Sequence, residues 1–115
     1  MSHQVLLSTL SNETGNHDDF RIFIFGSHES IPQQLIKLSD NLNLKIYYDD
    51  FNQCDEDIKS IKSDCSILFV FTDYFDYMLY LSECTKIHSI YVLNQNHQSI
   101  PYTKNDCAKL AYIFD

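Results

Sequence analysis

The amino-acid sequence predicts a single α/β domain built on a mostly parallel β-sheet. From Phe20 onward, apolar runs of strand length alternate with segments in which apolar residues recur at helical spacing. Several of these runs are nearly continuous, which is typical of strands that helices cover on both faces. A chain of 115 residues also has the length of one domain, because a second core would not fit.

The first 19 residues differ in character from the rest of the chain. Residues 11–19 are polar apart from one glycine, and the apolar run before them, residues 5–10, is short and has no basic region ahead of it. That pattern is unlike a secretory signal. We therefore expect residues 1–19 to form a polar leader, partly disordered, and residues 20–115 to form the α/β domain.

The first predicted strand is Phe20–Gly26, an apolar run interrupted by Arg21. A helix should follow it, with Ser30 as the N-cap and Pro32 in the first turn. Apolar residues then recur at helical spacing, at Ile31, Leu35, Leu38 and Leu42.

The second predicted strand, Leu44–Tyr48, ends at a pair of acidic residues. Asn52 is expected to cap the helix that follows. Acids in its first turn and lysines in its last would complement the helix dipole; they are Asp55, Glu56, Asp57, Lys59 and Lys62.

The third predicted strand, residues 67–72, is the most hydrophobic, so we expect it at the centre of the sheet. Residues 75–87 are predicted to form the third helix and residues 89–93 the fourth strand. A loop rich in Gln and Asn comes next, with a short helix expected around residues 102–107, before the fifth strand, Leu110–Phe114.

This order of elements predicts a three-layer sandwich with a five-stranded, mostly parallel sheet in the flavodoxin-like order 2-1-3-4-5, because crossovers are right-handed. The closing helix that this fold usually carries after its fifth strand is missing. Two explanations remain open. Either the chain is a fragment of a longer protein that supplies this helix, or a neighbouring segment covers that face of the sheet.

The composition excludes several classes of function. The net charge is −8 and the chain has no cluster of basic residues, so nucleic acid and anionic membranes are poor partners. No segment has the length of a membrane span. The spacing of the cysteines fits neither a zinc site nor a Cys-x-x-Cys motif, and we expect free thiols and a cytoplasmic location; they are Cys54, Cys65, Cys84 and Cys107.

Polar residues follow the predicted strands at the edge where α/β folds collect ligands. The acidic ones are Glu29, Asp49, Asp50 and Asp73, and carboxylates of this kind can hold a hard cation or a small ligand. Their spacing matches no metal motif, and acids are common where helices begin. The sequence therefore predicts no metal and no cofactor, and leaves these four acids as a candidate ligand edge.

Asp73 stands where phosphoryl-accepting receiver domains carry an Asp, but the acidic pair that such a site needs after the first strand is absent. We expect Asp73 to cap the third helix instead. The chain has only two glycines, Gly15 and Gly26, so it has no phosphate-binding loop. Gly26 is expected to let the chain turn out of the first strand.

The predicted third helix offers a candidate interaction surface. Tyr74, Tyr77 and Tyr80 recur every three residues, and Met78 and Leu79 lie among them. One face of this helix must pack on the sheet, which leaves aromatic residues for a second contact. The alternative is a thick core under long loops.

The predicted strand order also resembles that of Toll/interleukin-receptor (TIR) domains, some of which cleave NAD with a Glu on the third helix. That resemblance makes Glu83 the candidate catalytic residue. The residues around it, YLSEC at 80–84, differ from that family's motif, in which aromatic and Cys residues precede the Glu.

A second resemblance covers residues 20–115. The segments DFNQC at 50–54, SIYV at 89–92 and AYIFD at 111–115 look like the N-terminal α/β domain that precedes tetratricopeptide repeats or an arginine-type ADP-ribosyltransferase domain in some multidomain proteins. Those domains tend to carry Ser-Gly after the third strand, where this chain has Thr72 and Asp73. The resemblance implies an accessory or signalling domain, with any transferase activity in another domain.

Taken together, the sequence predicts a non-catalytic protein-interaction or signalling domain that binds a partner protein or a second copy of itself, through the third helix or the uncovered side near the fifth strand. The alternative is a small ligand-binding or NAD-cleaving domain that uses the acids at the strand ends. A third possibility is a truncated reading frame without an independent role.

Overall fold

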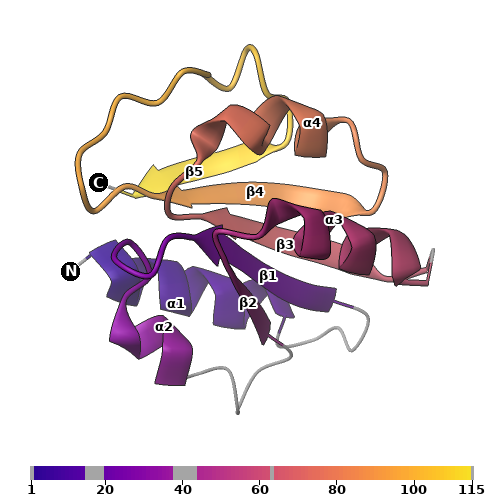
Figure 1. The fold of residues 1–115 in the computed structure, drawn as a ribbon, viewed down its shortest axis with the longest axis horizontal. Helices are drawn as coiled ribbons and strands as arrows, with labels where there is room; N and C mark the ends of the chain where they lie inside the picture. Colours follow the sequence, from indigo (N-terminus) through magenta and orange to yellow (C-terminus); the bar gives the residue numbers. More distant parts are fainter. Residues whose placement is uncertain (1, 15–19, 38–43, 63, 115) are drawn as a thin grey trace.

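The computed structural model describes residues 2–14, 20–37, 44–62 and 64–114. Five strands form one sheet in the order β2-β1-β3-β4-β5, and every neighbouring pair is parallel. Helices lie on both faces of this sheet (Figure 1). The predicted three-layer α/β architecture and its flavodoxin-like strand order are confirmed.

The strands are β1 (Phe20–Gly26), β2 (Leu44–Tyr48), β3 (Ser66–Phe71), β4 (Ile87–Leu93) and β5 (Leu110–Phe114). The predicted bounds of the first, second and fifth are confirmed, and β3 begins and ends one residue earlier than predicted. β3 pairs with both β1 and β4, and its side chains from Ile67 to Phe71 are completely buried. The most hydrophobic strand therefore lies at the centre of the sheet, as predicted.

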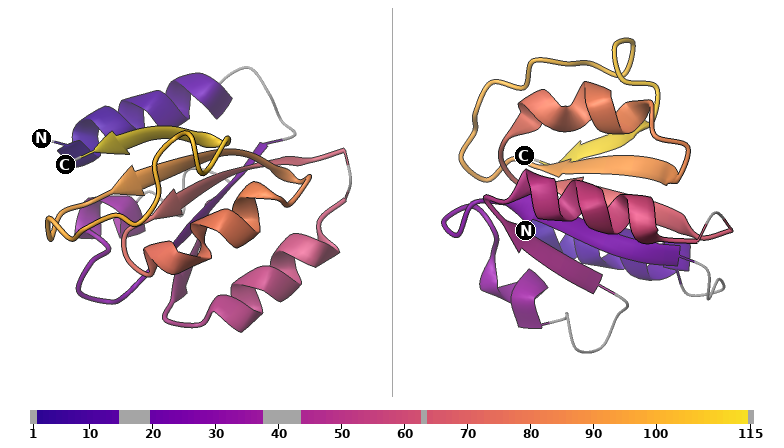
Figure 2. Two further views of the ribbon diagram at one scale, coloured as in Figure 1. Left: turned by 90° about the horizontal axis from the view of Figure 1, so that it is seen from above. Right: turned by 45° about the vertical axis from the view of Figure 1, so that its right-hand side comes forward.

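The helices divide between the two faces, as Figure 2 shows. On one face lie α1 (Ser2–Thr14) and α2 (Gln33–Lys37), which pack on the core that includes Ile24 and Val70. On the other lie α3 (Phe51–Ser60) and the pair η2 (Phe75–Tyr77) and α4 (Met78–Ser82). None of the described helices has the length and apolar character to cross a membrane.

Helix α1 corrects the expectation of a polar leader for residues 2–14. Its two central leucines, Leu6 and Leu10, are completely buried, and the helix contacts α2, β4 and β5. A spacing of four residues places both leucines on one face of a helix, and two large side chains are enough to anchor an otherwise polar segment. Helix α1 is thus a neighbouring segment that covers part of this face of the sheet, which was one of the two explanations.

Helix α3 begins earlier than expected. Asp50, rather than Asn52, is its N-cap, and the Asp50 Oδ1 atom accepts a hydrogen bond from the backbone N–H of Gln53 at 3.1 Å. Its last carbonyls are satisfied by Lys86, whose Nζ donates to the backbone oxygens of Ile58, Lys59 and Ile61 at 3.1, 2.8 and 2.5 Å. A lysine at this end also complements the helix dipole.

The prediction of a helix over residues 75–87 is wrong in length. A 3₁₀ turn, η2, leads into the five-residue α4, and the chain then turns back so that the Ile87 N–H donates to the carbonyl of Cys84 at 3.1 Å. Strand β4 consequently begins at Ile87, two residues before its predicted start. The apolar residues near position 87 belong to the strand, which periodicity alone cannot distinguish from a helix end.

The short helix expected around residues 102–107 is also absent from this described segment. Residues 94–109 contain no regular helix or strand. Asp106 instead closes a turn by accepting hydrogen bonds from the backbone N–H and the hydroxyl of Thr103, at 3.0 and 3.2 Å. Side-chain bonds of this kind favour turns over helices. The position between β4 and β5, where this fold usually carries a helix, is therefore occupied by an irregular segment.

The burial of α1 generates a first prediction. Leu6→Ala and Leu10→Ala should each lower the free energy of unfolding by about 2–5 kcal/mol, because each leaves a cavity against the sheet. Val5→Ala is the control, since Val5 is 55% exposed and its truncation should change stability by less than about 0.5 kcal/mol. Urea unfolding measures all three. Equal, small effects would show that α1 does not pack on the sheet in solution.

Candidate functional site

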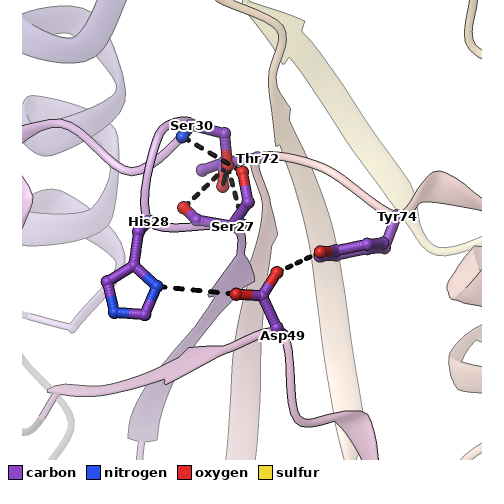
Figure 3. A network of polar contacts seen from close by, with 6 residues as sticks. All are labelled: Ser27, His28, Ser30, Asp49, Thr72 and Tyr74. Atoms are coloured by element: carbon purple, nitrogen blue, oxygen red, sulfur yellow. Dashed lines mark hydrogen bonds and ion pairs between the residues drawn. The ribbon is translucent and has the colours of Figure 1, made fainter.

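The candidate site lies where β1, β2 and β3 end. In this strand order the connection after β1 crosses one face of the sheet, through α2, and the connections after β2 and β3 cross the other. The loops therefore part at the end of β1, which is where open α/β sheets bind ligands. Figure 3 shows that side chains from the three loops meet there.

A pair of buried hydroxyl groups joins the loop after β1 to the end of β3. The Ser30 Oγ and Thr72 Oγ1 atoms are 2.7 Å apart, and both residues are almost completely buried. Ser27 completes the turn, because its N–H donates to Ser30 Oγ at 2.9 Å and its Oγ accepts from the Ser30 N–H at 3.2 Å. These bonds fix the first loop against the central strand.

Gly26 is the residue that allows this contact. A Cβ atom at this position would lie 1.8 Å from Thr72 Oγ1 and 2.7 Å from Ser30 Oγ, so any side chain would collide with the hydroxyl pair. Gly26 does not adopt a positive φ. Gly26 lets Ser30 and Thr72 approach its backbone closely, rather than letting the chain turn out of β1 as we predicted from the sequence.

Asp49 joins the loop after β2 to the loop after β3. Its Oδ1 atom accepts a hydrogen bond from the Tyr74 hydroxyl, and its Oδ2 atom is 3.5 Å from Nδ1 of His28, whose ring stacks on Tyr48 at 4.1 Å. The His28 and Asp49 side chains are 74% and 47% exposed, so their ion pair contributes little stability. Of the two Asp49 contacts, the hydrogen bond from Tyr74 is the one that involves an unusual backbone conformation.

The backbone at this contact is strained. Asp49 and Tyr74 have φ angles of 61° and 56°, in the left-handed region that residues other than glycine rarely adopt. Among the described residues, only His97 shares this property. Strained residues persist where the surrounding structure holds them, and they concentrate at binding and catalytic sites.

The bond to Asp49 also changes the acidity of Tyr74. It raises the pKa of Tyr74 to about 12, and some loss of solvent and the negative charges of Asp49 and Asp73 act in the same direction. The phenol therefore keeps its proton and remains a hydrogen-bond donor. Burial raises the pKa of the Cys54 thiol, and all four cysteines are free thiols, as the sequence predicted.

The structure places the four predicted acids in different local roles. Asp50 caps α3, and Asp73 accepts a hydrogen bond from the N–H of Tyr74 at 2.8 Å without being the N-cap of η2. Glu29 is exposed in the turn after β1, and Asp49 binds Tyr74. In the described part of the chain, no three His, Cys, Asp or Glu side chains gather as a metal site would require.

Glu83, the candidate catalytic residue, lies at the other end of η2–α4 from Tyr74. It is the C-cap of α4 and is exposed. Glu83 has no contact with the strand-end network around Asp49 among the interactions described above. Its role in NAD cleavage stays a prediction from the TIR resemblance.

Four of the five residues that the sequence predicted as an interaction surface are exposed. Tyr74, Tyr77 and Tyr80 are 37%, 40% and 49% exposed, and we call these three side chains the tyrosine ridge. Met78 is completely buried and belongs to the core. Leu79 is 37% exposed, but it lies about 200° around the helix from Tyr77, on the other flank of α4.

Contacts with α3 hold the ridge in place. The Tyr77 ring stacks on Phe51 with centroids 3.9 Å apart and planes at 7°. The Tyr80 hydroxyl donates to Asp55 Oδ1 at 2.9 Å, and this bond raises the pKa of Tyr80. Side chains of α3 therefore hold the Tyr77 and Tyr80 rings in place, and no local sequence pattern indicated these contacts.

Sequence reasoning also missed the pairing of Ser30 with Thr72 and the stacking of His28 on Tyr48. The two hydroxyl residues are 42 positions apart, and neither contact follows a local motif. The one available signal was a glycine next to Ser27, because a glycine at the end of a buried strand often marks close approach of another segment.

Comparison of this chain with protein-family models, curated proteins and solved structures finds no match. The resemblance to TIR domains and to the N-terminal domains of multidomain proteins stays a prediction. The function is therefore inferred from the described residues.

The close approach at Gly26 generates a second prediction. Gly26→Ala should lower the free energy of unfolding by about 1–3 kcal/mol, because the added methyl group pushes the hydroxyl pair apart. In a Thr72→Ala background, which removes Thr72 Oγ1, the cost of Gly26→Ala should shrink by about 0.5 kcal/mol or more. Chemical denaturation of the four proteins in this cycle measures the coupling. Strict additivity would contradict the proposed collision.

A third prediction follows from the Asp49–Tyr74 bond. The raised pKa of Tyr74, about 12 against 10 for a free tyrosine, means that the folded state holds the phenol proton more tightly than the unfolded chain. This stabilisation is present below pH 10 and is lost as the pH rises from 10 to about 12. In Asp49→Asn the pKa of Tyr74 should fall toward 10, which NMR titration of labelled tyrosine rings would show. An unchanged pKa would mean that the bond does not form in solution.

Proposed function

We propose that this domain is a protein-interaction module whose tyrosine ridge binds a basic segment of a partner protein. The observation that supports this is a row of exposed aromatic rings that are already held in place by Phe51, Asp55 and Asp49. Tyrosine supplies large contact area with few rotatable bonds, and rings fixed before binding lose less entropy on association.

Charge indicates the chemistry of the partner. Two of the three ridge hydroxyls donate to carboxylates, and Asp76 is exposed between Tyr74 and Tyr77 in the chain. One basic residue is close, Lys59, which pairs with Asp55 at 2.9 Å. Arginine and lysine side chains bind both aromatic faces and carboxylates. A basic segment therefore fits the ridge better than an acidic or purely apolar one.

The domain would then act as an accessory or signalling unit, bringing a basic partner to whatever protein carries it. A chain with net charge −8 attracts such partners over a distance and speeds their encounter, with a marked dependence on salt. Within this proposal the ridge performs recognition and no chemical step is assigned to it.

The second candidate function is binding of a small ligand at the strand ends, which the paired left-handed residues Asp49 and Tyr74 favour. A thermal-shift screen with NAD, common nucleotides, Mg²⁺ and Ca²⁺ separates the two. A ligand at about 100 times its Kd adds about 2.7 kcal/mol to the stability of the folded state. A shift that is lost in Asp49→Asn would support the ligand site, whereas the ridge proposal expects none.

The fourth prediction tests the ridge with defined probes. Fluorescence anisotropy would compare otherwise identical Gly- and Ser-based peptides that carry Arg, Lys, Glu or Leu. The Arg and Lys peptides should bind, with affinity falling as salt rises. Tyr77→Ala should weaken this binding by about 10-fold or more, as truncation of a central aromatic residue does.

Tyr77→Ala leaves the net charge unchanged, so its effect separates recognition by the ring from general attraction to an acidic protein. Leu79→Ala is the matched control, because Leu79 is similarly exposed on the adjoining helix α4 but on the other flank. It should change the affinity by less than about 2-fold. A preference for Glu or Leu peptides, or equal effects of the two substitutions, would refute the proposal.

A further inference from the structure

The outer edge of β5 differs from the opposite edge of the sheet. Both β2 and β5 are edge strands, and edge strands of soluble proteins usually carry features that discourage contact. In β2 a lysine, Lys45, forms an ion pair with Asp57 at 2.7 Å. Strand β5 has no charged residue, proline or glycine from Leu110 to Phe114. Charge therefore protects the β2 edge, whereas no charged residue protects the β5 edge.

Both faces of the sheet are incompletely covered beside β5. On the face of α1, a cavity of about 390 Å³ is lined by Val5, Thr9, Tyr91, Ala111, Tyr112 and Phe114. On the opposite face, a second cavity of about 400 Å³ lies between β5 and the irregular residues 94–109, with Ile100 and Tyr102 in its wall. Ala111 and Tyr112 line both cavities. The second cavity arises where a helix would otherwise pack between β4 and β5.

The most exposed large apolar side chains of the described residues meet at the first cavity. Tyr112 is 60% exposed and Val5 is 55% exposed. The Tyr112 ring contacts Phe114 at a centroid distance of 4.6 Å, so it is supported from below while its outer surface faces solvent. Apolar surface gathered in this way commonly marks a site of contact with another protein.

Charge distinguishes this surface from the tyrosine ridge. Among the described residues, neither cavity has an acidic residue in its lining, and Lys104 is the one charged residue in either. In a chain with net charge −8, two copies repel one another over most approaches. They can come together with least electrostatic cost where no acid faces the contact. The ridge, with Asp49, Asp55 and Asp76 beside it, disfavours a second copy.

We propose that the β5 edge is a self-association surface, at which a second copy of this chain packs its own β5 edge around Tyr112 and Val5. An identical copy brings the same acid-free apolar surface, and a two-fold axis lets one patch satisfy both partners. The register of β5 against β4 shifts between Ile90 and Tyr91. Such irregularities discourage continuous pairing of edge strands, so side-chain packing, rather than a ten-stranded sheet, holds the two copies together.

The fifth prediction concerns the oligomeric state of the whole chain. Sedimentation velocity over about 1–200 μM, a range that includes weak homodimers, should show a monomer–dimer equilibrium. Tyr112→Lys and Val5→Lys should each weaken it by about 10-fold or more. Tyr112→Phe keeps the ring and should dimerise like the natural chain. Far-ultraviolet circular dichroism would check that each variant is folded. We expect folded variants, because the side chains of Tyr112 and Val5 are exposed.

Leu79→Lys is the matched control, since it adds the same charge to an exposed apolar position that lines neither cavity. It should leave the dimer intact. A natural chain that stays monomeric throughout, or a dimer lost in Leu79→Lys and kept in Tyr112→Lys, would overturn the proposal. A monomer that floats with phosphatidylcholine vesicles and loses this binding in Tyr112→Lys would also overturn it, because the occupant of the surface would then be a lipid.

Discussion

The central strands of this sheet are apolar on both faces, and both faces must therefore be covered. Residues Ile67 to Phe71 of β3 are completely buried, with one set of side chains facing α3 and α4 and the other facing α1 and α2. Burial of apolar surface is the main force that stabilises such a domain. This requirement accounts for helix α1, which supplies Leu6 and Leu10 to a face that the other helices do not fill. It also accounts for the surface beside β5, where residues 94–109 cover the sheet less completely than a helix would.

The parts of the structure that could be predicted from sequence are those governed by local patterns. Apolar runs of strand length predicted the bounds of β1, β2 and β5. The alternation of strands with helical segments predicted the strand order, because the crossovers between parallel strands are right-handed. Helix α1 escaped prediction because its apolar face consists mainly of Leu6 and Leu10 within a polar segment. The third helix was predicted too long because Ile87 is apolar in either a helix or a strand, and only pairing with Ile67 of β3 decides between them.

The candidate site depended on contacts that no local pattern contains. The acids at the strand ends were identified correctly as residues of that edge, but their partners were not. Ser30 meets Thr72, and Asp49 meets Tyr74, across gaps of 42 and 25 residues. The left-handed backbone of Tyr74 likewise reflects the tertiary structure, since a tyrosine seldom adopts it, whereas Asp visits this region more often than most residues. Sequence therefore located the edge, and the fold determined which side chains meet there.

Tyr74 connects the strand-end network to the tyrosine ridge. Its hydroxyl binds Asp49, and its ring packs on Phe25, which also contacts Tyr77. The two surfaces consequently share Tyr74, and a substitution of Asp49 would affect the ridge through the Asp49–Tyr74 hydrogen bond.

The ridge and the β5 edge share no lining or ridge residue. The ridge rests on α3, which follows β2 and packs against it, and β2 and β5 are the two outermost strands. A dimer formed through β5 would leave both ridges accessible, because neither takes part in the contact. Two ridges on one particle would bind a partner carrying two basic segments far more tightly than either ridge alone, provided that the partner can span them. Dimerisation would in this way turn a modest, salt-sensitive interaction into a selective one.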